Sequence, residues 1–122
     1  MKPYVYGNSV YVVLDGDLDI DSREEIAEAL PPPEQITGGV INLARATYVD
    51  STLLGMLVQF RRNFIKSGGD PSNLILVLAK DGKVRRTFEL TGMNRLFSVA
   101  YVESTPLGPQ EYLTRGREYR IT

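Results

Sequence analysis

The sequence has 122 residues, of which 43% are hydrophobic, and this is enough for one hydrophobic core. Fourteen basic and fifteen acidic residues give a net charge of −1, which argues against electrostatic binding to nucleic acid or to an anionic membrane. Cysteine and histidine are both absent, which excludes disulfides, thiolate chemistry and the commonest general base and metal ligand.

The first part of the sequence predicts a hairpin followed by a helix. Residues 4–6 and 10–14 are rich in strand-forming side chains, and residues 7–9, Gly-Asn-Ser, can close a tight turn between them. Residues 22–25, Ser-Arg-Glu-Glu, have the pattern of a capping box that starts a helix. Residues 31–33 are three prolines, which end that helix because proline lacks the backbone donor.

The remainder predicts three strands and two helices. We expect strands at residues 40–44, 74–79 and 99–102, of which the second is apolar throughout, as in a strand buried on both faces. One helix is expected from Ser51 to about Ser67, and another ends at Gly92. The first of these helices carries an apolar stripe at helical spacing: Leu53, Leu57, Phe60 and Phe64.

Strands and helices alternate from residue 10 to residue 102, with connections too long for hairpins. This alternation predicts an α/β fold with a mixed, mostly parallel sheet, an antiparallel first strand and helices packed against it. We expect one domain over residues 1–122, with a tail at 103–122 that has a possible short helix at 110–113. The longest apolar run is too short to cross a bilayer, and no secretory signal is evident, so we expect a cytoplasmic protein.

The residues Asp50-Ser51-Thr52 are placed where an α/β sheet usually binds its partners, between a strand and the following helix. All three are favoured helix caps, so capping alone can explain them. Leu53 is either an exposed partner contact or the start of the core stripe. Asp17, Asp19 and Asp21 alternate with other residues and invite a metal site. The glycine and distal glutamate of a calcium loop are absent, so a polar loop is favoured and no metal or cofactor is expected.

Three stretches share the pattern of a known family. Gly16–Asp19 matches its Gly-acid-Leu-Asp after the second strand, and Tyr48–Gly55 matches its loop of an aromatic, an apolar residue and Asp-Ser-Ser/Thr-Gly-Leu-Gly. Phe88–Phe97 matches its third helix and Leu-x-Gly-Leu-x-x-Leu-Phe connector. In this order, over roughly residues 10–102, they resemble the STAS domain shared by bacterial anti-sigma-factor antagonists. The chain differs from the pattern at Leu53, a glycine in the family, and at Asn42, an aspartate in the family.

In antagonists of this family, the serine after the aspartate is phosphorylated by a cognate anti-sigma factor that is itself a serine kinase. The unphosphorylated form binds that kinase and frees the sigma factor, and a phosphatase restores it. The resemblance therefore implies that Ser51 is the phosphoacceptor. It also implies a partner-binding surface made of Asp50, Thr52, Leu53 and Asp19.

The resemblance implies a regulatory protein. The residues also argue against an enzyme, because no pair of side chains has a recognisable catalytic spacing. The alternative is a STAS subunit that is never phosphorylated, in a transport or stress-sensing assembly, and the differences at Leu53 and Asn42 motivate it. Neither reading involves direct binding to nucleic acid or membrane. Both leave the oligomeric state open.

Overall fold

The computed structural model describes residues 3–103 except residue 7, and for residues 3–6 it describes the backbone alone. The possible helix at 110–113 lies outside the described residues. The strands are β1 (Pro3–Tyr6), β2 (Ser9–Val13), β3 (Gly16–Leu18), β4 (Gly38–Asn42), β5 (Ala46–Val49), β6 (Leu74–Ala79) and β7 (Ser98–Val102). The helices are α1 (Arg23–Ala29), α2 (Ser51–Lys66), α3 (Lys83–Thr91) and α4 (Met93–Leu96), with the short 3₁₀ turns η1 (Ile20–Ser22), η2 (Pro33–Gln35) and η3 (Pro71–Asn73).

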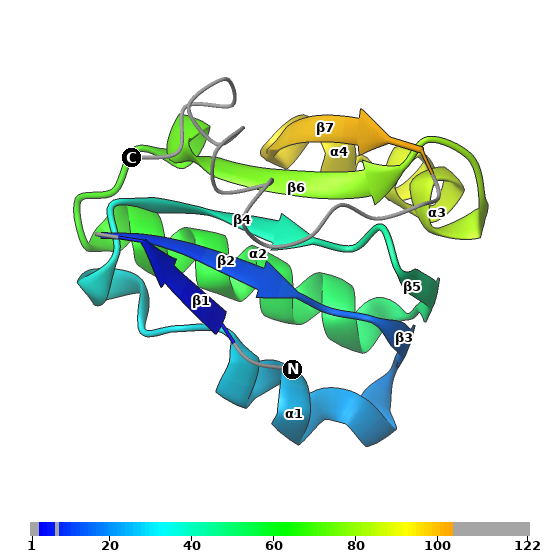
Figure 1. The fold of residues 1–122 in the computed structure, drawn as a ribbon, viewed down its shortest axis with the longest axis horizontal. Coiled ribbons are helices and arrows are strands. Elements are labelled where there is room, and N and C mark those ends of the chain that lie inside the picture. Colours follow the sequence, from blue (N-terminus) through cyan, green and yellow to red (C-terminus); the bar gives the residue numbers. More distant parts are fainter. Residues whose placement is uncertain (1–2, 7, 104–122) are drawn as a thin grey trace.

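Five strands form the main sheet in the order β1-β2-β4-β6-β7 (Figure 1). The pair β1–β2 is antiparallel, and the other three pairs are parallel. The predicted α/β fold with a mostly parallel sheet and an antiparallel first strand is therefore confirmed. The hairpin is as tight as expected, because Tyr6 pairs with Ser9.

A second, two-stranded parallel sheet was not predicted. It consists of β3 and β5, which lie side by side at one end of the main sheet (Figure 1). The strand that was expected at 40–44 begins and ends two residues earlier, at Gly38 and Asn42. Gly39 permits a close approach to β2, since a Cβ there would lie 2.7 Å from Cγ1 of Val10.

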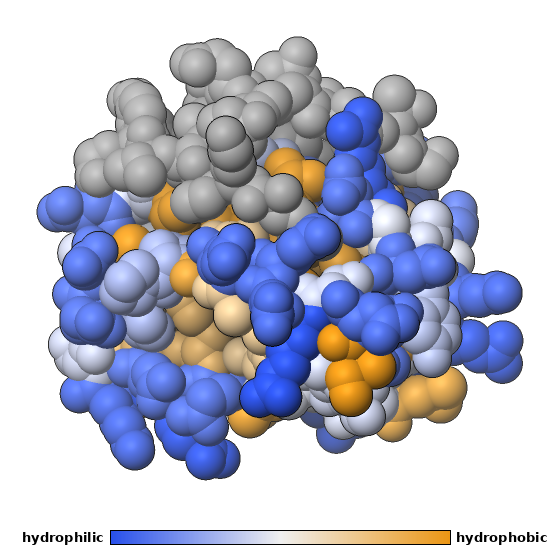
Figure 2. All heavy atoms as spheres, turned by 90° about the horizontal axis from the view of Figure 1, so that it is seen from below, coloured by the Kyte–Doolittle hydropathy of each residue, from blue (hydrophilic) through white to orange (hydrophobic). Residues whose placement is uncertain are grey.

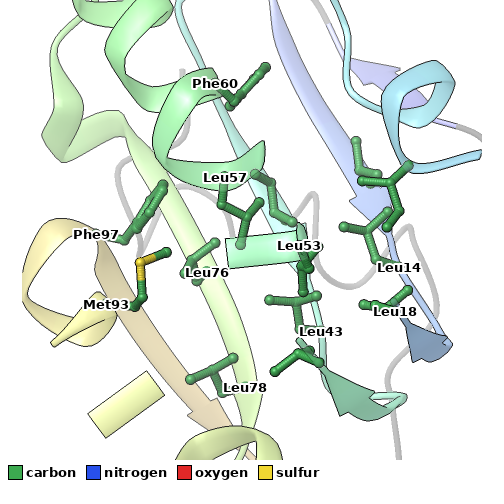
Figure 3. Packing of buried hydrophobic residues seen from close by; sticks show 14 of the residues in the cluster. Leu14, Leu18, Leu43, Leu53, Leu57, Phe60, Leu76, Leu78, Met93 and Phe97 are labelled. Atoms are coloured by element: carbon green, nitrogen blue, oxygen red, sulfur yellow. The ribbon is translucent and has the colours of Figure 1, made fainter. Parts of the chain in front are cut away.

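The hydrophobic core lies between the main sheet and the helices. The apolar stripe of α2 packs on the sheet, and every buried residue of α1, α2, α3 and α4 belongs to this one cluster (Figure 3). The opposite face of the sheet carries a smaller buried cluster: Tyr11, Val40, Ala44, Ile75, Val77 and Ala100. The strands are thus apolar on both faces, as the sequence of β6 predicted.

The predicted capping box at the start of α1 is wrong. The hydroxyl of Ser22 donates to the backbone carbonyl of Asp17 at 3.0 Å and makes no cap hydrogen bond to α1. Asp19 begins the helical segment instead, since its Oδ1 accepts from the backbone N–H of Asp21 at 3.0 Å. The helix ends before the three prolines, as expected.

Arg85 connects α3 to the edge strand β7. Its Nε donates to Glu89 Oε1 at 2.6 Å, and its guanidinium lies over the ring of Tyr101, 4.2 Å from the centroid. The hydrogen bond to Glu89 raises the pKa of Arg85 above its ordinary value. In the part of the chain that the structure describes, no helix has the length and apolar character needed to cross a membrane.

Candidate functional site

The small sheet brings two loops together at the end of the molecule. Leu18 pairs with Val49 at the ends of β3 and β5, and the backbone N–H of Asp50 donates to the carbonyl of Leu18 at 3.2 Å. Asp19 and Asp50 follow directly on the two strands. The structure therefore places Asp19 on the loop next to the one that opens α2.

Asp50 is the N-cap of α2. Its Oδ1 accepts hydrogen bonds from the backbone N–H groups of Thr52 at 2.9 Å and Leu53 at 3.3 Å. These are two of the donors that the first turn of a helix cannot satisfy internally. The carboxylate also lies at the positive end of the helix dipole, which stabilises it. Of the three possible caps in the sequence, the aspartate takes the role.

Ser51 is the first residue of α2, and its side chain is exposed. No hydrogen bond joins its Oγ to any of the described residues, and Asp50 supplies the cap of the helix. Thr52, the next residue, is half-buried. The hydroxyl of Ser51 is therefore accessible and has no part in holding the helix start.

Leu53 is fully buried, with 0% of its side chain exposed, so its predicted role as a partner contact is wrong. It begins the core stripe of α2, and Figure 3 shows it among the side chains of Leu14, Leu18 and Leu43. The helix turns this position toward the sheet because it lies four residues before the buried Leu57. A docking protein cannot reach this side chain.

Asn42, the other difference from the family pattern, is also inside the protein. Its side chain is 1% exposed, its Nδ2 donates to the hydroxyl of Tyr11 at 2.8 Å, and its Oδ1 accepts from the N–H of Ala44 at 2.8 Å. The amide is thus paired on both sides at the end of β4. It shapes the turn that leads to β5 and presents nothing to the surface.

The aspartates between β2 and α1 do not gather around a common point. Asp17 Oδ1 accepts from the hydroxyl of Thr47 at 2.6 Å, and Asp19 accepts from the N–H of Asp21. Across the described residues, no three acidic side chains come together as a metal site requires. The carboxylates act as caps and strand links.

Sequence reasoning did not identify Ile20, Tyr48 and Gly55 as surface features of this site. Ile20 is 66% exposed and Tyr48 is 50% exposed, although both are apolar or aromatic. Gly55 is exposed on α2, and a Cβ there would meet nothing within 4 Å. The signal for Ile20 and Tyr48 was weak because their exposure depends on β3 and β5, which the sequence did not predict. Gly55 lies outside the apolar stripe of the predicted helix, and that position is the signal that could have identified it.

An open groove of about 340 Å³ lies between α1 and α2. Figure 2 shows an apolar hollow bordered by hydrophilic side chains on this side of the molecule. The groove is lined by Ala27, Leu30, Pro31, Pro32, Pro33, Met56, Gln59, Phe60 and Asn63. None of these side chains can titrate or act as a nucleophile at ordinary pH, and Ser51 is not among them. The groove is therefore separate from the site at the start of α2.

Known proteins share this fold and part of this sequence. The anti-sigma-B factor antagonist of Staphylococcus epidermidis is 32% identical over 90 residues, which cover 72% of this chain and 80% of that protein. An anti-sigma factor antagonist from Mycobacterium paratuberculosis is structurally similar, with a TM-score of 0.65 and 18% identity over 94% of this chain and 91% of that one.

SpoIIAA of Bacillus, an anti-sigma factor antagonist, is similar in both solved forms, each with a TM-score of 0.62. The unphosphorylated form is 20% identical, and the match covers 93% of this chain and 94% of that one. The phosphorylated form is 21% identical, and the match covers 92% of this chain and 94% of that one. At this identity, the structural likeness shows the fold. The family model of the STAS domain matches residues 2–105. The family match spans all of the described structure, and the motifs around Asp19 and Ser51 lie on adjacent loops, so this chain belongs to the STAS domain family.

Proposed function

We propose that this chain is an anti-sigma-factor antagonist, a regulatory binding protein and not an enzyme. It binds an anti-sigma factor through the surface around Ser51 and so releases a sigma factor. The partner is a serine kinase that phosphorylates Ser51, and the phosphorylated form no longer binds. The observation that carries this proposal is the exposed Ser51 hydroxyl, which has no hydrogen bond to the described residues at the start of α2.

A phosphate on Ser51 is compatible with the fold. It adds about −1.5 to −2 charges near neutral pH, and the start of a helix tolerates such an anion through its dipole. Because Asp50 supplies the cap, the modification removes no hydrogen bond that the helix needs. We therefore expect the phosphorylated protein to keep the same structure and close to the same stability.

The same phosphate changes what the surface can bind. The two loops that meet here carry Asp19 and Asp50 as helix caps. Both caps are acidic, so neither of them offsets the negative charge of the phosphate. A partner packed against Ser51 would have to remove water from the phosphate. An unpaired charge buried in this way costs several kcal/mol, which is roughly a 100-fold loss of affinity or more.

The differences at Leu53 and Asn42 do not alter this surface. Both side chains are buried, so neither of them adds a side chain to the face around Ser51. The reversible switch also requires a phosphatase that restores the hydroxyl. A phosphatase can reach this serine because its side chain projects from the first turn of α2.

To test the proposal, the protein is incubated with ATP and each anti-sigma-type serine kinase of the same genome, and intact mass is measured. One kinase should add a single phosphoryl group to the wild type and to Thr52→Ala, and none to Ser51→Ala. Thr52 is the matched control because it is the neighbouring hydroxyl. Labelling that survives Ser51→Ala, or no labelling by any kinase, rejects phosphorylation at this site.

A binding measurement separates the switch from the alternative of a permanent subunit. Ser51→Asp should bind the same partner at least tenfold more weakly than the wild type, because it places a carboxylate at the docking face. Equal binding of the wild type and Ser51→Asp to a partner without kinase activity would instead identify a STAS subunit that is not phosphorylated.

A further inference from the structure

The loops after β3 and β5 present equivalent residues next to each other. Both strands are followed by a cap aspartate in nearly the same conformation, with φ −130° and ψ −170° at Asp19 and φ −121° and ψ −176° at Asp50. The residue after each cap is the first of a helical turn, and these residues are Ile20 and Ser51. The strands pair in parallel up to Leu18 and Val49, so the isoleucine occupies the position on its loop that the serine occupies on the neighbouring loop.

Ile20 is not an isolated apolar side chain on this face. It is 66% exposed, and Tyr48, on β5 three residues before Ser51, is 50% exposed. A single exposed apolar residue is ordinary, whereas a large aliphatic and an aromatic side chain near one functional group are typical of a surface that a partner covers. Both belong to the small sheet or to the loop that follows it.

One position next to Ser51 on α2, Gly55, carries no side chain. Ser51 and Gly55 are four residues apart and so lie on the same face of α2. Gly55 is exposed, and a Cβ built on it would meet nothing within 4 Å. The backbone of α2 is therefore open to close approach immediately beyond the serine. Ser51 thus has this bare position one turn further along α2, and Ile20 at the equivalent position on the neighbouring loop.

The surroundings of Ile20 are strongly acidic. Residues 15–25 contain six carboxylates and one arginine, a net charge of −5. Five of the six acidic side chains are exposed, and within the described part of the chain none of the six forms an ion pair. A surface that covers Ile20 must therefore face these carboxylates, and basic side chains at its rim would complement them.

We infer that Ile20 and Gly55, with Ser51 between them, form the surface that docks the anti-sigma factor. This inference rests on the proposed function and adds the chemistry of the partner. Ile20 enters an apolar pocket of the anti-sigma factor, basic side chains around that pocket face residues 15–25, and a packed part of the partner lies directly on the helix at Gly55. A phosphate on Ser51 would then be enclosed between two apolar contacts.

The test measures the affinity of full-length variants for the purified anti-sigma factors of the same genome by calorimetry. Ile20→Asp should bind about tenfold more weakly or worse, as expected for a central apolar anchor. Gly55→Leu should bind similarly weakly because its side chain fills the position that the partner would approach. Leucine is compatible with the helix. The matched control is Ile65→Asp, because Ile65 is 39% exposed and lies near the other end of α2. This variant should bind within twofold of the wild type. Raising the salt concentration should weaken wild-type binding.

The outcomes separate the two ideas. If the wild type binds an anti-sigma factor and either Ile20→Asp or Gly55→Leu keeps the wild-type affinity, this docking surface is wrong and the proposed function remains. An equal loss in Ile65→Asp also overturns it, because the effect would then not be specific to this face. If the wild type binds none of the anti-sigma factors, the proposed function itself fails. Urea unfolding of each variant verifies that it is folded before its affinity is compared.

Discussion

The helix start at Asp50 offers the sharpest test of the structure. Asp50→Ala removes the Oδ1 atom that accepts from Thr52 at 2.9 Å and from Leu53 at 3.3 Å. The backbone hydrogen bond from the N–H of Asp50 to Leu18 is unaffected. Loss of an N-cap costs about 0.5–2 kcal/mol. One of the two amides belongs to a fully buried residue, where water cannot replace the lost acceptor, so we expect about 1–2 kcal/mol.

The assay is urea unfolding followed by far-ultraviolet circular dichroism, with the midpoint as the readout. For a chain of this length, about 1 kcal/mol corresponds to roughly 3–5 °C in thermal midpoint, which gives an independent measurement. Asp50→Asn separates the hydrogen bonds from the charge. It keeps an acceptor oxygen and should lose less than half as much, because asparagine caps about as well as aspartate.

Ser51→Ala is the control for this series. Its Oγ makes no hydrogen bond to the described residues, so the variant should unfold within about 0.5 kcal/mol of the wild type. Two results would refute the reasoning. One is an Asp50→Asn variant as unstable as Asp50→Ala, and the other is a Ser51→Ala variant that loses as much as Asp50→Ala.

Four further substitutions test the interior and the helices by the same unfolding assay. Leu53→Ala should lose about 2–5 kcal/mol because it empties a fully buried position, and a loss below about 0.5 kcal/mol would show that Leu53 is on the surface. Asn42→Ala should lose about 1–3 kcal/mol because the N–H of Ala44 loses its acceptor, and wild-type stability would contradict that bond. Gly55→Ala should gain about 0.5–1 kcal/mol at an open helical position, whereas Gly92→Ala should lose about 1–2 kcal/mol because its φ is 77°. Changes of the same sign in both glycines would contradict this.

The main elements could be predicted because each is long enough to show a period. The helix α2 has 16 residues and carries an apolar stripe from Leu53 to Phe64, and β6 is an apolar run of six. The strands β3 and β5 have three and four residues and no clear pattern, because their pairing depends on a contact between segments about 30 residues apart. Local sequence does not contain that information.

The candidate site was predictable in place and only partly in detail. The sequence located Ser51 between a strand and a helix, but three adjacent cap residues left open which of them caps. The backbone decides for Asp50, since its extended conformation aims Oδ1 at the first amides of α2. The failure at Ser22 has the same cause, because Asp19 starts a 3₁₀ turn three residues earlier. The family pattern alone could not give the burial of Leu53, which follows from the direction of the helix over the sheet.

The neutral amide of Asn42 has a consequence for the response of the fold to acid. Apart from Tyr11, which contacts Asn42, the buried polar residues of the described structure are Ser9 and Asn42. Neither of these two side chains gains or loses a proton in the physiological range. An aspartate at that position would make the interior sensitive to proton concentration. With the amide, no carboxylate is buried among the described residues. The negative charge of residues 15–25 therefore lies at the surface, and the described core offers acid no carboxylate to protonate.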